Sequence, residues 1–599
     1  MPSTENQSQI SPVEERINSL IKQMALEEKI GQMTQVEKNS ISPEEVRNYF
    51  IGSVLSGGGG FPSINTPVAW ADMVDTYQKC AMETRMAIPL IYGVDAVHGH
   101  SNMNGAVIFP HNIGLGASRN PNLVFQIGRA TAEELVATGI YWNFAPTIAV
   151  PQDIRWGRTY EGYSENTQVV SNLGAAYIRG LQGDKLDTDH FVLATPKHFL
   201  GDGGTTWGSS SFRNNQLDQG DTRIDEETLR KIHLSPYLSA IQNGAMCIMA
   251  SFSSWNGRRM TANNYLLTDV LKEELGFTGF IVSDWQAVDQ LSDDYYQAVS
   301  MAVNAGIDMT MVPYDYKKYI STLLRAVQQG AVAETRINDA VHRILHVKLM
   351  LGLFDRPYAQ RVFLSHVGSE SHRMLARQAV SESLVLLKND NKILPISKDV
   401  KLILVAGRGA DNIGIQCGGW TIEWKGIDGN QIPGTTILQG LKNITSQDTR
   451  IIYEPSGKFD ITSEAKRKLA LAHIGIVVVG ETPYAEGDGD SEDLCLSQND
   501  VELIHQMRSI CHRLVVILIS GRPMNITDQL PLIDALVCAW LPGQEGEGIA
   551  DVLFGDKEFK GRLPYTWPKS MDQIPFNFEN LPTGDKSPLF PFGYGLEAN

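Results

Sequence analysis

The chain lacks long apolar runs and a recognisable leader. Met1–Ile10 is polar, without the apolar core of a signal peptide, and no uninterrupted apolar stretch is long enough to cross a bilayer. We therefore expect no membrane partner and a cytoplasmic location, with secretion only if a leader has been removed.

Positive charge is also scarce. The 599 residues carry a formal net charge of -17 at pH 7, and the sequence pI is ≈ 5.3. Such a surface repels nucleic acid and anionic membranes, so we expect neither as a partner. A neutral substrate is not repelled.

Cysteine is rare and scattered. None of the six cysteines belongs to a CxxC pair or a zinc-ligand cluster. Cys247 and Cys538 lie in apolar runs and are expected to be buried free thiols. His98-Gly99-His100 has no third ligand spaced to join it, so the sequence predicts no metal site.

Two loops resemble a cofactor-binding or calcium-binding motif but lack residues that the motif requires. Gly407-Arg408-Gly409 follows a predicted strand but lacks the third glycine of a dinucleotide fingerprint. The stretch Gly480–Asp493 is rich in glycine and carboxylates, yet the glycine and the terminal glutamate of an EF-hand calcium loop are out of place. It is either a solvated acidic loop or one that presents a carboxylate to a site. We predict no cofactor.

What the sequence does contain is a repeated alternation of short apolar runs with longer amphipathic segments. The length of the chain, 599 residues, predicts more than one domain. Repeated βα alternation predicts a parallel sheet covered by helices, long enough here for an α/β fold of the (β/α)8 TIM-like barrel type. An eighth strand is missing or degenerate, because seven are recognised: Ile51–Leu55, Leu90–Val94, Trp142–Ala145, Val192–Ala194, Met246–Ser251, Phe280–Ser283 and Ile307–Met311.

The predicted organisation has four parts. They are a barrel domain over 1–355, a linker over 356–370, an α/β sandwich domain over 371–567 and a C-terminal extension over 568–599. Ser11, Pro12 and Glu14 form a capping box that predicts a helix at the start of the chain. The second domain is expected to contain a helix over Ser371–Glu382 and an open sheet with strands Leu384–Leu387, Leu402–Val405, Ile474–Val479, Leu514–Ile519 and Ala535–Trp540.

Polar residues follow several predicted barrel strands. Asp284 ends the apolar run Gly279–Ser283, at the edge where a β/α barrel carries its catalytic residues. Asp284 could instead cap the next helix. Other chemically useful side chains follow neighbouring strands: Asp95, His98, Arg158, Lys197 and His198. Each of these side chains, taken alone, has a purely structural explanation. Their clustering at the ends of neighbouring strands favours a functional site.

The second domain offers a carboxylate and two indoles. Glycosidic-bond hydrolysis needs one carboxylate that attacks the anomeric carbon and one that protonates the leaving oxygen. A carboxylate from the Gly480–Asp493 loop can pair with Asp284 for this purpose. Trp420 and Trp424 lie on a glycine-flanked loop, where flat rings suit sugar stacking, although both could be core residues.

These residues lie in motifs that resemble glycoside hydrolase family 3, above all the plant-type β-D-glucan exohydrolases and bacterial β-glucosidases. The resemblance spans nearly the whole chain. It is carried by Leu26–Met33, Gly93–Gly99, Arg155–Arg158, Lys197–Phe199, Gly201–Thr205, Val282–Trp285, Ser383–Asn389, Cys417–Trp424 and Gly561–Pro564.

The resemblance implies a retaining exo-acting β-glucosidase or β-glucan glucohydrolase, with its site between a barrel and an α/β sandwich. Asp284 would be the nucleophile and Glu486 the acid/base, with carboxyl groups about 5–5.5 Å apart. The residues implied to bind the terminal glucosyl unit are Asp95, Arg158, Lys197, His198 and Trp420. Trp285 and Trp424 would clamp the next sugar.

The chain departs from the family pattern at Phe252, where relatives carry Tyr, at Gln290, where an Arg is expected, and over Trp207–Asp221. The effect of these changes on substrate preference stays open, as do linkage, substrate length and oligomeric state. So does the choice of acid among the loop carboxylates Glu481, Glu486, Asp488 and Asp490.

Alternative functions are a β-xylosidase, an N-acetylglucosaminidase of the same family and a non-catalytic sugar-binding protein. The N-acetylglucosaminidase is disfavoured, because Leu200–Gly203 replaces the Pro-Gly-His-Gly expected after Lys-His-Phe. A binding protein would not need both carboxylates.

Overall fold

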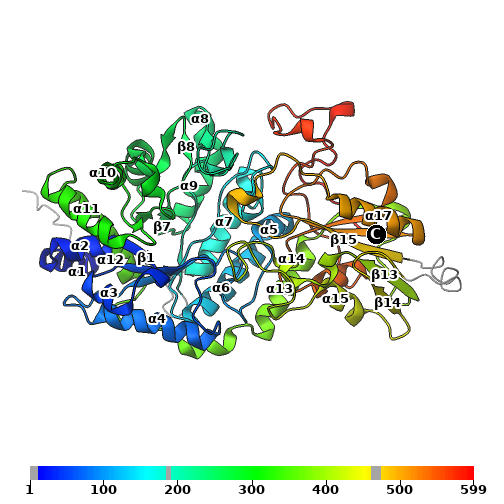
Figure 1. The fold of residues 1–599 in the computed structure, drawn as a ribbon, viewed down its shortest axis with the longest axis horizontal. Helices are drawn as coiled ribbons and strands as arrows, with labels where there is room; N and C mark the ends of the chain where they lie inside the picture. The colour runs from blue at the N-terminus through cyan, green and yellow to red at the C-terminus, as the bar shows by residue number, and fades with distance from the viewer. Residues whose placement is uncertain (1–10, 184–190, 460–473, 599) are drawn as a thin grey trace, which may run out of the picture.

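The computed structural model describes residues 11–183, 191–459 and 474–598, so the polar start of the chain lies outside the described residues. Figure 1 shows two α/β units side by side along the long axis. Helices from the first half of the chain surround the unit on the left, and the sheet containing β13, β14 and β15 forms the unit on the right. No helix within the described ranges is both long and apolar enough to cross a membrane.

The first domain is built on parallel strands. Hydrogen bonding orders six of them as β11-β1-β2-β3-β4-β5, and β7 pairs with β10. Single bridges from Phe199 to Ala250 and from Val282 to Met309 join these two sheets. The barrel strands within the described ranges are β1 (Thr34–Glu37), β2 (Ser53–Ser56), β3 (Ile91–Val94), β4 (Trp142–Asn143), β5 (Leu193–Ala194), β7 (Cys247–Met249), β10 (Phe280–Val282) and β11 (Thr310–Met311).

The strand that the sequence did not reveal is β1. Thr34, Gln35 and Glu37 are buried although polar, so the strand has no apolar run to recognise. Gln35 Nε2 donates to Ser53 Oγ on β2 at 2.9 Å, which satisfies this amide inside the barrel. The α/β barrel architecture predicted from the sequence is therefore correct, and its eighth strand is a polar one.

Helices cover the outside of the barrel (Figure 1). They are α1 (Pro12–Gln23), α2 (Leu26–Gln32), α3 (Pro43–Asn48), α4 (Pro67–Met82), α5 (Asn112–Ser118), α6 (Pro121–Ala137), α7 (Thr167–Gln182), α8 (Glu226–Thr228), α9 (Ser235–Gln242), α10 (Tyr295–Ala305), α11 (Tyr316–Gln328) and α12 (Glu334–Met350).

The capping box predicted at the first helix forms only in part. Ser11 Oγ accepts a hydrogen bond from Glu14 N, as expected for an N-cap. The Glu14 carboxylate, however, contacts His342 Nε2 on α12 at 2.7 Å. The reciprocal half of the box is thus replaced by a tertiary contact between α1 and α12.

The second domain contains a mixed sheet with the order β12-β17-β16-β15-β13-β14. All neighbours are parallel except β12 and β17. The strands are β12 (Val385–Asn389), β13 (Leu402–Ala406), β14 (Arg450–Tyr453), β15 (Ile474–Gly480), β16 (Leu514–Ile519) and β17 (Ala535–Trp540). Sequence analysis missed β14, an edge strand whose side chains are half-buried or exposed.

Helices pack around this sheet: α13 (Glu370–Ser383), α14 (Ile413–Cys417), α15 (Ile437–Ile444), α17 (Gln498–Ile510) and α18 (Glu547–Leu553). The predicted helix over Ser371–Glu382 corresponds to α13. The boundaries assigned above to the linker and the C-terminal extension stay predictions. All six cysteines are free thiols, and Cys247 and Cys538 are buried.

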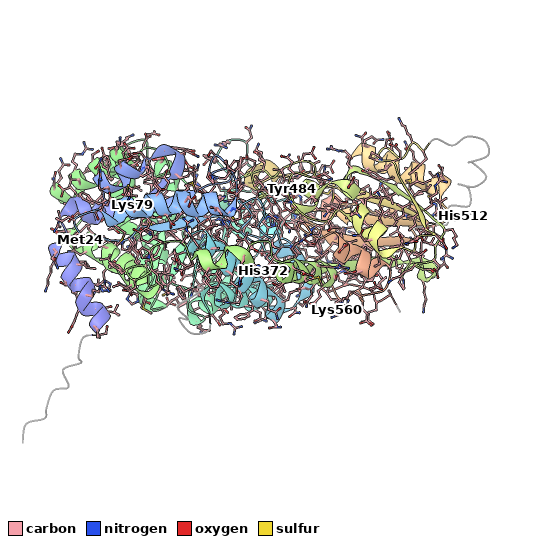
Figure 2. The ribbon with its side chains drawn as sticks, turned by 90° about the horizontal axis from the view of Figure 1, so that it is seen from below. Met24, Lys79, His372, Tyr484, His512 and Lys560 are labelled. Carbon is pink, nitrogen blue, oxygen red and sulfur yellow. The ribbon has the colours of Figure 1, made fainter. Side chains whose placement is uncertain are left out.

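Helix α13 of the second domain contacts the barrel domain through His372, which lies near the middle of the long axis in Figure 2. His372 Nδ1 contacts Glu134 Oε1 at 2.8 Å and Nε2 contacts Glu133 Oε2 at 3.3 Å, both on α6. Burial alone would lower the pKa of His372, but hydrogen bonds to the two glutamates outweigh it and raise the pKa to about 9.

We predict that this contact stabilises the folded protein below neutral pH and weakens in alkali. The folded-state pKa lies above the unfolded value of about 6.5, so the stabilisation is fully present below that pH and is lost as pH rises through about 9. Allowing for partial solvent exposure, we expect at most about 2 kcal/mol. The Tm difference between wild type and His372→Gln should be larger at pH 6 than at pH 9.5. A difference that does not change with pH would contradict this assignment.

Candidate active site

A cavity of ≈ 1030 Å³ opens between the barrel strands and the loops of the second domain. It is lined by every residue that the family resemblance assigns to the site: Asp95, Arg158, Lys197, His198, Asp284, Trp285, Trp420, Trp424 and Glu486. The buried ring of His98 lies behind this wall, within 3.0 Å of Phe109 O and 3.3 Å of Trp420 O.

The barrel side of the cavity follows from strand direction. Asp95 comes directly after β3, Lys197 and His198 follow β5, and Asp284 follows β10. Parallel strands in a barrel end on the same face, so their loops converge there. Arg158 lies in the longer loop after β4.

The second domain supplies three further predicted residues of the lining. Trp420 and Trp424 lie on the loop after α14, and Glu486 begins a short turn, η11 (Glu486–Gly489), in the loop after β15. Glu486 has φ 52 and Trp420 has φ 59, a left-handed conformation that costs non-glycine residues free energy and is concentrated at functional sites.

The two carboxylate oxygens of Asp284 differ, because one accepts a hydrogen bond and the other does not. Oδ1 accepts from Trp285 N at 2.7 Å, whereas buried Oδ2 has no hydrogen-bond partner among the described residues. Gln286 occupies the N-cap position of the following turn, and no side chain accepts a capping hydrogen bond there, so the helix-cap interpretation of Asp284 is wrong. Burial raises the pKa of Asp284 to about 7, Arg158 opposes that rise and Glu486 adds to it.

Arg158 connects the acidic groups of the site. Its Nε and Nη2 atoms donate to the two carboxylate oxygens of Glu161 at 2.9 Å each. Its Nη1 atom reaches Glu486 Oε1 of the second domain at 3.2 Å. A bidentate pair of this kind fixes the plane of the guanidinium, so Glu161 sets the direction from which Arg158 meets Glu486.

Arg158 also determines which ring nitrogen of His198 carries the proton. Arg158 Nη2 lies 3.2 Å from His198 Nε2, and a guanidinium can only donate. The imidazole proton is therefore on Nδ1, which faces Asp202 Oδ2 at 2.8 Å. Burial lowers the pKa of His198 well below its usual range, and the cations Arg158 and Lys197 lower it further. His198 is neutral, so its Nε2 atom, 3.6 Å from Asp284 Oδ2, forms no ion pair there.

The loop carboxylates that were candidates for the acid have different partners. Glu481 Oε1 pairs with Arg522 at 2.9 Å, and Asp488 pairs with Lys425. Asp490 accepts hydrogen bonds from backbone N–H groups. Among these carboxylates Glu486 alone lines the cavity with Asp284. Burial raises the pKa of Glu486, although Arg158 opposes the rise.

The remaining predicted residues pair with neighbouring polar groups in the cavity wall. Lys197 Nζ pairs with Asp95 Oδ1 at 2.8 Å. Trp420 Nε1 donates to Glu161 Oε1 at 3.2 Å, and the ring is nearly buried in the core of the second domain. Trp420 is thus both a core residue and a part of the cavity wall.

A glycine-rich loop after β2 lies against the other two indoles. A Cβ on Gly57 would approach the Trp285 ring to 3.3 Å, and one on Gly58 would lie 2.6 Å from the Trp424 backbone. Larger residues would displace Trp424 or crowd Trp285. Sequence analysis did not identify this loop.

Glu161 and Asp202 were also missed by the sequence analysis. Both lie close in sequence to predicted residues, three positions after Arg158 and four after His198, and both are buried. A buried carboxylate near a cation or a histidine is the signal that could have found them, but burial cannot be read from these polar loops.

Phe252, Gln290 and part of the segment Trp207–Asp221, the departures from the family pattern, line the cavity. Phe252 contributes a ring, and Gln290 Nε2 donates to Gln219 Oε1 at 3.0 Å, a neutral amide pair. Phe212 and Arg213, from the unusual segment Trp207–Asp221, also contribute. The Arg213 guanidinium lies over the Phe212 ring, 4.9 Å from its centroid. No group of three or more potential metal ligands occurs within the described ranges.

Comparison with known proteins agrees with this architecture. The chain is 35% identical to the lysosomal beta glucosidase of Dictyostelium discoideum, over 97% of this chain and 75% of that protein. It is 29% identical to a beta-xylosidase of Formosa agariphila, over 87% and 76%. A crystal structure of a mutant exo-1,3/1,4-beta-glucanase from a Pseudoalteromonas species superposes with a TM-score of 0.90 at 42% identity, covering 98% of this chain and 96% of that one.

Family models match both halves of the chain. The glycosyl hydrolase family 3 N-terminal domain matches residues 25–347, and the C-terminal domain of the same family matches residues 384–598. The protein is thus a glycoside hydrolase, and it belongs to glycosyl hydrolase family 3.

Proposed function

We propose that this protein is a retaining, exo-acting β-glucosidase that releases glucose from the non-reducing ends of β-glucosides and β-glucans. The observation that carries the proposal is the presence of Asp284 and Glu486, from different domains, in one cavity with Arg158 beside them. Relatives named as a β-glucosidase and an exo-β-glucanase support the choice of sugar.

In the proposed first step, Asp284 Oδ2 attacks the anomeric carbon and a covalent glucosyl ester forms. Glu486 gives its proton to the glycosidic oxygen as the bond to the leaving group breaks. In the second step Glu486 takes a proton from water, the water oxygen attacks the same carbon, and Asp284 is released. Two inversions give net retention. The carboxyl separation expected for this mechanism stays a prediction.

The burial and charge around the two carboxylates support the roles proposed for them. Burial raises the pKa of Glu486, which favours the protonated form that an acid needs. Burial raises the pKa of Asp284 as well, and Arg158 and Lys197 oppose that rise, which favours the ionised form that attacks. The proposed glucosyl-binding groups are Asp95, Arg158, Lys197, His198 and Trp420, and Trp285 and Trp424 are proposed to hold the next sugar.

Replacing each proposed carboxylate tests its role. Asp284→Asn should lose at least about 10³-fold in kcat on an aryl β-glucoside, because the amide cannot form the ester.

Glu486→Gln should lose about 10²–10⁴-fold in kcat on substrates whose leaving group needs protonation. On an aryl β-glucoside with a good leaving group, azide should restore turnover and yield β-glucosyl azide, since this small anion attacks the glucosyl enzyme without a general base.

Asp488→Asn is the matched control, because its carboxylate lies in the same loop but pairs with Lys425. It should stay within about threefold of wild type. A Glu486→Gln enzyme with near wild-type activity would place the acid elsewhere.

A substrate panel separates the alternatives within the family. We expect kcat/KM to be highest for the aryl β-glucoside and lower for the matching β-xyloside and N-acetyl-β-glucosaminide. Calorimetric binding of glucose by a protein inert towards all three would favour a sugar-binding protein, and a faster β-xyloside would favour a xylosidase.

The pH profile should reflect the buried nucleophile. Asp284 must be ionised to attack, and burial raises its pKa, so activity falls as pH falls through that raised value. We expect the acid limb of kcat/KM to lie above the ordinary aspartate pKa of about 3.9. A limb at or below that value would show that the carboxylate is not desolvated in the free enzyme.

A further inference from the structure

The loop that carries Glu486 is fastened to the barrel domain four residues later, at Asp490. Asp490 Oδ1 accepts from Gly157 N at 2.9 Å. Its Oδ2 accepts from Gln216 N, Leu217 N and Asp218 N at 2.9, 2.8 and 2.9 Å. All four donors are backbone groups of the barrel domain, on two different loops.

Three successive N–H groups that converge on one oxygen form an anion-binding concavity, and hydrogen bonds to an ionised acceptor are stronger than neutral ones. The neighbouring acids are held differently. Asp488 pairs with Lys425, and Asp493 Oδ1 accepts from Cys495 N at 2.9 Å. Both of those partners belong to the second domain, so they do not bridge the domains.

The backbones also meet closely at this point. A Cβ on Gly157 would lie 2.0 Å from Glu486 O and 2.7 Å from Gly489 Cα. Ser491 N adds a bond to Arg155 O at 3.0 Å. The stretch 157–158 therefore meets the acid loop twice, through Gly157 N on Asp490 and through Arg158 Nη1 on Glu486.

We propose that Asp490 is a positioning residue that sets the place of Glu486 relative to Asp284 across the domain boundary. This inference rests on the proposed function, in which Glu486 is the acid/base. Because the two carboxylates come from different domains, their separation depends on what fastens one domain's loop to the other. The same carboxylate holds residues 216–218, beside Gln219 in the cavity wall.

The test compares two substrates by kcat/KM, which reports the first chemical step. A dinitrophenyl β-glucoside has a leaving group that departs without a proton, whereas an alkyl β-glucoside needs one from Glu486. Asp490→Asn keeps the size of the side chain but turns an N–H group towards backbone donors. We expect a loss of about 100-fold on the alkyl glucoside and of less than about fivefold on the dinitrophenyl glucoside.

Asp493→Asn is the matched control and should leave both values within about twofold, because its contact stays inside its own loop. Equal losses on both substrates for Asp490→Asn would show a general structural role and overturn the proposal. Unchanged values on both would overturn it as well.

Gly157→Ala disturbs the neighbouring backbone contact between the barrel and the acid loop, and it keeps the proposal testable if Asp490→Asn does not fold. Its added methyl group collides with Glu486 O, so the same selective loss on the alkyl glucoside supports the proposal and an equal loss contradicts it. Failure of the proposed function itself would look different, because wild type would then be inert on both glucosides.

Discussion

The site depends on the placement of one buried cation, Arg158. Glu161 accepts from Nε and Nη2 along one edge of the guanidinium, and Nη1 reaches Glu486 across the domain boundary. Removing one partner from a buried ion pair costs about 3–5 kcal/mol, because the other charge is left without compensation. Arg158 therefore keeps several carboxylates close together that would otherwise repel one another, and it also fixes the tautomer of His198.

The division of the site between two domains follows from the folds themselves. A barrel gathers side chains at the carboxyl ends of its strands, so it can hold Asp284 rigidly within a wall of polar groups. The acid/base candidate comes from a long loop after β15, outside the barrel. Rigid attachment of that loop is therefore as important as the carboxylate it carries, and the bonds of Asp490 to backbone N–H groups provide it.

Much of the fold was predictable because most strands are apolar runs, and Asp284 was predictable because it ends one of them. The polar strand β1 was missed because it has no such run, and β14 was missed because its apolar run, Ile451–Tyr453, is only three residues long and lies at the edge of the sheet. Glu161 was missed, and Asp490 was considered only as a candidate acid, for another reason. Their importance comes from partners distant in space or hidden within loops, and neither burial nor a backbone donor can be read from residue types.

The most direct test of the account is to trap the glucosyl enzyme. A β-glucosyl fluoride with a second fluorine on the adjacent ring carbon should lose its anomeric fluoride to Asp284 and form a slowly hydrolysed ester. Mass spectrometry of peptides should then find the added sugar on Asp284. Label on another residue, or steady turnover without any label, would contradict the central claim that Asp284 attacks the anomeric carbon.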